Sequence, residues 1–96
     1  MNRDTVQQLL TAHRAELDRL YVKSLAVFGS VARGEARSKS DVDILVEFSN
    51  TPDFDQYMDL KFFLEDLLKR RVDLVTPDAL KPRIRPNVER EAVRVA

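Results

Sequence analysis

The sequence contains no cysteine. A chain without cysteine cannot form disulfides, present a thiolate nucleophile or bind a metal ion through sulfur, so these classes of site are excluded. Because disulfides are rare in reducing compartments, their absence also agrees with a cytoplasmic protein, which is the location we expect.

Long apolar segments and an excess of one charge are also missing. No apolar run approaches the ~20 residues that a membrane-spanning helix needs, and the first twenty residues lack the apolar centre of a signal peptide. The 16 lysines and arginines balance the 16 aspartates and glutamates. A chain with zero net charge has no general attraction to nucleic-acid phosphates or anionic lipids. We therefore expect neither a membrane nor a nucleic acid as a direct partner.

The residues that are present indicate a small globular protein. Of its 96 residues, 44% are hydrophobic and 33% are charged, a composition typical of folded domains. A domain of this length buries roughly 60–70% of its unfolded surface, which is enough for one sheet and a helical layer. We expect residues 1–96 to form a single domain.

Apolar spacing predicts the order helix, strand, turn, strand, helix, strand, helix. Asp4 or Thr5 would cap the first helix, whose buried face is marked by Val6, Leu9, Leu10, Leu17 and Leu20. The other expected elements are strands at Ser24–Phe28, Val42–Phe48 and Arg71–Val75, a helical turn at Val31–Arg33, a helix at Phe54–Arg70, a tail helix from Pro82 or Pro86 to Glu91, and an edge strand within Val93–Ala96. This order predicts an α/β or α+β domain, a small mixed β-sheet flanked by helices. The aromatic residues expected in its core are Phe54, Tyr57, Phe62 and Phe63.

The first feature that indicates chemistry is Gly29-Ser30, directly after the first strand. Glycine allows a tight turn and a close approach of the backbone to a ligand. Ser30 would lie at the start of a helical turn, where free N–H groups favour a phosphate. Taken alone, such a pair is more often a simple turn that ends a strand.

The second feature is Asp41 and Asp43 at the start of the second strand. Residues two apart in a strand face the same side, so these carboxylates would lie together while Val42 faces the core. Two neighbouring negative charges repel each other, and a cation between them would relieve the repulsion. Oxygen ligands favour Mg²⁺ or Mn²⁺. An isolated pair of this kind could also be a solvated strand start.

The third feature is Asp73 within the apolar strand Val72–Val75. An acid among apolar residues is unusual unless it is paired or coordinated. Arg70 or Arg71 could neutralise it, so its sequence context alone leaves a structural and a functional role open.

In combination, the three features resemble the minimal nucleotidyltransferases of the DNA polymerase beta superfamily, and in particular the MNT antitoxins that accompany HEPN-domain ribonuclease toxins. The resemblance covers nearly the whole chain. It depends on Phe28-Gly29-Ser30-Val31-Ala32-Arg33-Gly34, on Asp41-Val42-Asp43 after ten intervening residues, and on Val72-Asp73-Leu74-Val75. It implies the nucleotidyltransferase fold.

The resemblance also implies roles for these residues. Asp41 and Asp43 would hold one or two Mg²⁺ ions, and Gly29 and Ser30 would hold the β- and γ-phosphates of ATP. Asp73 would act as general base and would also touch a metal ion. Arg33 would contact phosphate, although an exposed structural arginine explains it equally well.

For the antitoxin branch, the resemblance implies that AMP is transferred from ATP to a tyrosine of the HEPN toxin, which is thereby neutralised. Two alternatives stay open. The acceptor could be a small hydroxyl compound such as an aminoglycoside, although a chain of 96 residues favours a protein acceptor. The protein could also be an antitoxin that acts by binding alone, although all three aspartates are present.

Overall fold

The fold is built on a mixed four-stranded sheet. The computed structural model describes residues 2–35 and 41–96. The strands are β1 (Val22–Phe28), β2 (Val42–Phe48), β3 (Val72–Val75) and β4 (Val93–Arg94), in the spatial order β3-β2-β1-β4. β1 is antiparallel to β2 and β4, whereas β2 and β3 are parallel. The predicted mixed sheet flanked by helices is confirmed.

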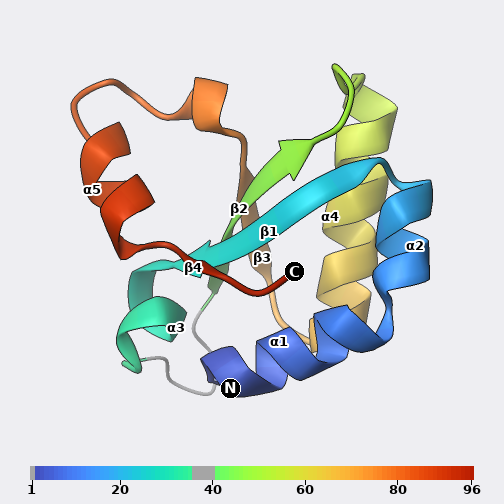
Figure 1. Ribbon diagram of the computed structural model, residues 1–96, viewed down its shortest axis with the longest axis horizontal. Coiled ribbons are helices and arrows are strands. Elements are labelled where there is room, and N and C mark those ends of the chain that lie inside the picture. The colour runs from blue at the N-terminus through green and yellow to red at the C-terminus, as the bar shows by residue number, and fades with distance from the viewer. Residues whose placement is uncertain (1, 36–40) are drawn as a thin grey trace.

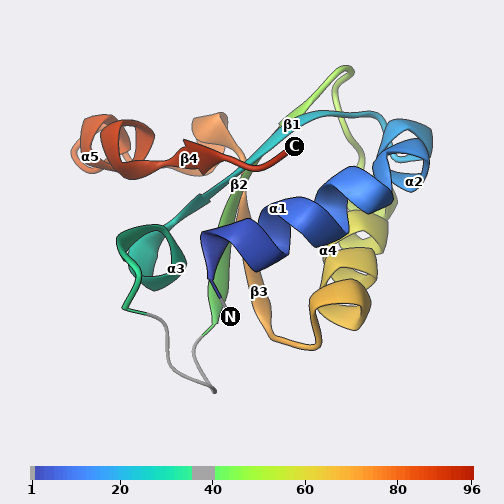
Figure 2. The ribbon, with the colours of Figure 1, turned by 60° about the horizontal axis from the view of Figure 1, so that its bottom comes forward.

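The helices divide into two groups. They are α1 (Arg3–Ala12), α2 (Arg14–Arg19), α3 (Gly29–Arg33), α4 (Phe54–Leu68) and α5 (Arg85–Glu91), with a 3₁₀ turn η1 at Pro77–Ala79. Figures 1 and 2 both show α1, α2 and α4 packed together, while α5 lies away from them and α3 lies beside the start of α1. α3 contacts β1, β2 and α5. One group therefore covers the sheet, and the other lies where β1 ends and β2 begins.

The core lies between the sheet and α1, α2 and α4. Val42, Ile44 and Val46 alternate along β2 and are buried, as the period of two predicts. They belong to one cluster with Leu60, Leu64 and Leu68 of α4 and with Val6, Leu10 and Leu17 of α1 and α2. Since alternate residues of β2 supply this core, Asp43 and Leu45 face the opposite side of the sheet, where the side chains are partly exposed.

Two aromatic residues expected in the core are exposed instead. The exposed fraction is 75% for Phe54 and 58% for Phe62. Phe62 lies two positions from both Leu60 and Leu64, a rotation of about 200° around the helix, and therefore points away from the sheet. The prediction is wrong because the buried stripe of α4 consists of leucines spaced by four.

The first helix is broken into α1 and α2 at His13, where a continuous helix was expected. The ring Nδ1 of His13 donates a hydrogen bond to the carbonyl of Leu9 (2.9 Å). The backbone N–H of His13 instead donates to the carbonyl of Leu10 (3.1 Å). Asn2, and neither Asp4 nor Thr5, caps α1, because its side chain accepts a hydrogen bond from the N–H of Thr5 (2.9 Å).

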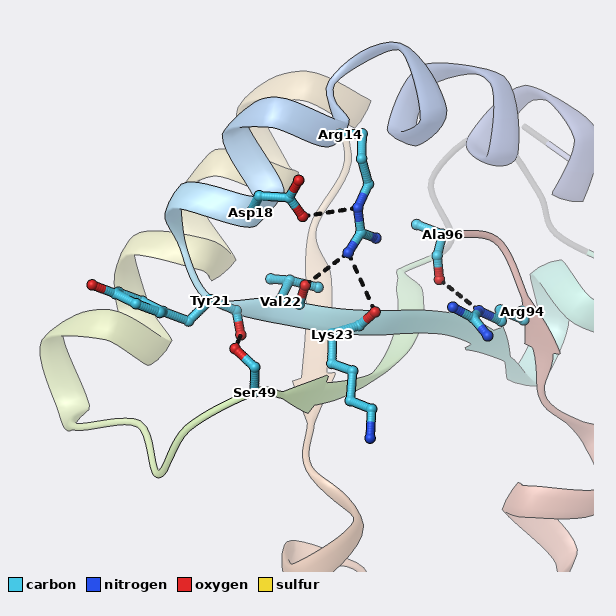
Figure 3. A network of polar contacts seen from close by, with 8 residues as sticks. All are labelled: Arg14, Asp18, Tyr21, Val22, Lys23, Ser49, Arg94 and Ala96. Atoms are coloured by element: carbon cyan, nitrogen blue, oxygen red, sulfur yellow. Dashed lines mark hydrogen bonds and ion pairs between the residues drawn. The ribbon is translucent and has the colours of Figure 1, made fainter.

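Arg14 joins the second of these helices to the sheet (Figure 3). Its guanidinium donates to the backbone carbonyls of Val22 (2.9 Å) and Lys23 (3.3 Å), and its Nε pairs with Asp18 (3.0 Å). This contact fixes the direction in which β1 leaves α2. β1 begins at Val22, two residues before the predicted start.

Helix boundaries near the site follow their capping residues. α4 begins after Asp53, whose side chain accepts from the N–H of Gln56 (2.7 Å), and it ends where Lys69 adopts a left-handed conformation, with φ of 55°. The tail helix begins at Arg85 with Pro86 in its first turn, which confirms the later of the two expected starts. In the residues described, no helix is both long and apolar enough to cross a membrane.

Truncation of a core leucine of α4 should destabilise the protein. We expect Leu64→Ala to lower the free energy of unfolding by about 2–5 kcal/mol, because it opens a cavity in a filled core. Phe62→Ala, on the exposed side of the same helix, should change it by less than about 1 kcal/mol. Urea denaturation followed by circular dichroism measures both. Equal losses for the two variants would contradict the assigned helix face.

Candidate active site

The register of the sheet brings the predicted residues together. Asp43 lies directly opposite Phe28 of β1 on one side and Asp73 of β3 on the other. Residues in register on neighbouring strands project from the same face, about 5 Å apart. Asp43 therefore lies between the end of β1, where Gly29 follows, and Asp73.

Asp41 completes the group from the residue before β2. Asp43 is half-buried, whereas Asp41 and Asp73 are exposed. Within the described part of the chain, neither Arg70 nor Arg71 forms an ion pair with Asp73. The structural explanation for an acid in β3, neutralisation by a neighbouring arginine, therefore has no support in the geometry.

Gly29 is required at its position for two separate reasons. Its φ is +68°, a left-handed conformation that residues with a Cβ rarely adopt. A Cβ built on Gly29 would also overlap Oδ2 of Asp43 and would lie 3.1 Å from its Cγ. The backbone of α3 thus begins in direct contact with the Asp43 carboxylate.

Ser30 is the second residue of α3 and is half-buried. The backbone N–H groups of the first turn have no partner within such a helix, so they are available to a ligand. The C-terminal end of α3 is closed by Gly34, also left-handed, and by a hydrogen bond from the N–H of Glu35 to the carbonyl of Ser30 (2.8 Å). The short helix therefore presents its first turn beside Asp43.

The electrostatics of the site centre on Asp43. Burial raises the pKa of its carboxyl above the ordinary value for an aspartate, and the negative charges of Asp73 and then Asp41 raise the pKa further. Arg33 acts in the opposite direction. A carboxyl group that is half-buried beside two other aspartates forms a centre that a cation would stabilise.

Arg33 is exposed and forms two ion pairs, with Glu35 (3.1 Å) and with Glu91 at the end of α5. Glu91 also contributes to the raised pKa of Asp43. Glu91 was not predicted from the sequence, because it lies 58 residues from Arg33 and has no motif around it. The structure places Arg33 beside the acidic group with its guanidinium held by two glutamates, and its contact with phosphate stays a prediction.

The donor set fits a divalent cation of the Mg²⁺ type. All three candidate ligands are carboxylates, and Mg²⁺ is bound through one or two carboxylates together with substrate phosphates. As the described side chains stand, no three histidine, aspartate or glutamate residues converge closely enough to hold a metal ion by themselves. The pair Asp41 and Asp43, completed by phosphate oxygens, is therefore the arrangement that agrees with this geometry.

A pocket of about 310 Å³ borders the acidic group at the β3 edge. Asp41 and Asp73 line one part of it, and Tyr57, Lys61 and Glu65 of α4 line another. The sequence analysis also missed these α4 residues, although their spacing of four places them on one helix face.

Comparisons with known proteins agree with this geometry. Residues 10–95 match the nucleotidyltransferase domain family. The chain is 46% identical over 93 residues to the protein adenylyltransferase MntA of Thermococcus cleftensis, a match that covers 96% of this chain and 94% of that protein.

Solved structures show the same fold. One, described as a candidate minimal nucleotidyltransferase, has 42% identity and a TM-score of 0.82, and the match covers 97% of this chain and 95% of that one. Another is a tri-AMPylated HEPN toxin of Shewanella oneidensis in complex with its MNT antitoxin, with 22% identity and a TM-score of 0.65. That match covers 94% of this chain and 71% of the other and shows a shared fold.

The two glycines of α3 provide a matched test of the contact with Asp43. Gly29→Ala and Gly34→Ala should each cost about 1–2 kcal/mol of stability, since both residues have positive φ. Only Gly29→Ala should displace the Asp43 carboxylate, because a Cβ at Gly34 meets no atom of the described residues within 4 Å. We expect Gly29→Ala to weaken Mn²⁺ binding in the presence of ATP at least about tenfold, as measured by calorimetry. Equal Mn²⁺ affinity in both variants would contradict the assigned contact.

The raised pKa of Asp43 predicts a pH-dependent stability in metal-free buffer. A carboxyl whose pKa is raised on folding contributes stability below the unfolded pKa of about 3.8, and this contribution is lost as the pH rises through the folded pKa. Asp43→Asn should therefore raise the free energy of unfolding at pH 7. The gain should shrink as the pH approaches 3.8.

Glu47→Gln is the control for this pH experiment, because Glu47 is exposed on the same strand and pairs with Lys23 (3.4 Å). Denaturation curves at several pH values with EDTA present would measure both variants. A loss of stability at pH 7 in Asp43→Asn would show that the folded state favours the ionised carboxylate, contrary to the geometry.

Proposed function

The chain belongs to the nucleotidyltransferase domain family, and from this premise we propose that it transfers AMP from ATP to a hydroxyl group of a partner protein. The observation that carries the proposal is the register of Asp43 with Asp73, directly beside Gly29. It places two carboxylates of adjacent strands next to the backbone turn that would receive a triphosphate.

Asp41 and Asp43 would hold one or two Mg²⁺ ions together with phosphate oxygens of ATP, with Asp73 as a further ligand. Such an ion, when bound, neutralises the triphosphate and the charge that develops during transfer. The first turn of α3, at Gly29 and Ser30, would bind the β- and γ-phosphates through backbone N–H groups and the serine hydroxyl. Arg33 would contact a phosphate once its guanidinium leaves the pairs with Glu35 and Glu91.

Asp73 would act as general base. It is exposed, and no described arginine pairs with it, so its carboxylate is accessible to an acceptor. Asp73 would accept the proton of the acceptor hydroxyl while that oxygen bonds to the α-phosphorus. The bond from the α-phosphorus to the bridging oxygen breaks, and pyrophosphate leaves.

The acceptor that we propose is a tyrosine of a HEPN-domain ribonuclease toxin, with the protein acting as its antitoxin. Two comparisons support this choice. The Thermococcus relative at 46% identity is named a protein adenylyltransferase, and the Shewanella neighbour is an MNT antitoxin bound to an AMPylated HEPN toxin. AMP on the toxin would then block its ribonuclease site.

Mass spectrometry of the partner tests the proposal. The protein is incubated with ATP, Mg²⁺ and a HEPN-domain protein that co-purifies with it, and we expect this partner to gain the mass of one or more AMP groups on tyrosine. Asp41→Ala and Asp43→Ala should each reduce the rate of transfer at least about 100-fold, because loss of the metal removes several kcal/mol of transition-state stabilisation.

Glu47→Ala is the matched control, since it removes an exposed carboxylate from the same strand outside the acidic group. Unchanged transfer after loss of both Asp41 and Asp43 would contradict the assigned site. If the double variant neutralises the toxin fully without any transfer, the protein acts by binding alone.

A further inference from the structure

Three side chains of α4 close the outer edge of β3. The carboxylate Oε2 of Glu65 accepts from the backbone N–H of Val72 (2.9 Å), and Nζ of Lys61 donates to the carbonyl of the same residue (2.9 Å). Lys61 and Glu65 also pair with each other (2.9 Å). One turn earlier in α4, the hydroxyl of Tyr57 donates to the carbonyl of Leu74.

These contacts replace a missing strand. β3 is an edge strand of the sheet and has four residues, so its alternate backbone groups point away from β2. Unpaired groups on such an edge are a weakness that proteins cover. Spacing by four places Tyr57, Lys61 and Glu65 on one face of α4, in line with the strand. The edge is thereby fixed by side chains rather than by another backbone.

Asp73 lies between the two residues that are held in this way. Its own position is in register with Asp43 of β2, while Val72 and Leu74 on either side are bound to α4. The side chain of Asp73 therefore projects from a stretch of backbone that is held on both sides. A shift of β3 along β2 would break all three contacts to α4.

Glu65 has the charge that this role needs. The hydrogen bond from the Val72 N–H, and then the one from Lys61, lower the pKa of the Glu65 carboxyl below its usual value. Glu65 is 26% exposed and Lys61 28%, so the pair is partly screened from water. At neutral pH the carboxylate accepts both hydrogen bonds.

We propose that Glu65, with Lys61 and Tyr57, is a positioning residue that holds β3 in register and so sets Asp73 against Asp43. The proposal rests on the proposed function, in which Asp73 is the general base. Asp41, Gly29 and Ser30 lie outside β3, so loss of the contact should impair proton removal far more than nucleotide binding.

Glu65→Ala tests this in the complete chain. We expect kcat for AMP transfer to the HEPN-domain partner to fall about 10- to 100-fold, as displacement of a catalytic group by about 1 Å does, with KM for ATP changed less than about threefold. Glu65→Gln keeps an oxygen acceptor for the Val72 N–H and should restore kcat to within about fivefold of the wild type. Tyr57→Phe, a milder change, should lower kcat in the same direction.

Asp66→Ala is the matched control, because Asp66 is the next residue on α4, is 88% exposed and pairs with Lys69 (3.7 Å). Hydrogen exchange gives a readout that does not require the partner protein that receives AMP. Protection of the Val72 amide should be lost in Glu65→Ala and kept in Glu65→Gln and Asp66→Ala.

Three results would overturn the proposal. One is full kcat in Glu65→Ala, with or without protection at Val72. Another is an equal loss of kcat in Asp66→Ala, which would indicate a general effect on α4. The last is a rise in KM for ATP that is as large as the fall in kcat. An inactive wild type with normal protection at Val72 would instead identify the proposed function as the failed step.

Discussion

The arrangement of the site depends on three carboxylates that the backbone holds close together despite their repulsion. Asp43 and Asp73 face each other because β2 and β3 pair in register, and Asp41 precedes the same strand. Burial and these neighbouring charges raise the pKa of Asp43, so the apo protein carries an electrostatic cost at this point. Backbone hydrogen bonds and the leucine and valine core on the other face of the sheet offset that cost, and a cation with a triphosphate would remove it.

The surrounding elements keep this group accessible and in place. Gly29 allows α3 to begin against Asp43, in a position where any Cβ would displace the carboxylate. α4 supports the group from the far edge, where Glu65 and Lys61 bind the backbone of Val72. α5 reaches it through the pair of Glu91 with Arg33. The group is thus bordered by α3 at β1 and β2 and by α4 at β3.

Much of this was predictable from local patterns. The alternation in β2 places Val42 in the core and Asp43 outside it, and the prediction of Val42–Phe48 as a strand is confirmed. The position of Asp73 opposite Asp43 depends on strand register, which no local pattern specifies. The ion pair with Glu91 joins residues far apart in the chain. Side-chain competition explains other misses: the His13 ring takes the Leu9 carbonyl and breaks the first helix, and the leucines of α4 leave Phe54 and Phe62 exposed.

The central claim is that this acidic group is a cation-dependent nucleotide site. A crystal structure with Mn²⁺ and an ATP analogue that carries a methylene group between its α- and β-phosphorus atoms tests it most directly. We expect an anomalous Mn²⁺ peak bound to Asp41 and Asp43, with the β- and γ-phosphates at Gly29 and Ser30 and the α-phosphorus facing Asp73. Nucleotide bound elsewhere on the chain, or Mn²⁺ bound away from Asp41 and Asp43, would contradict it.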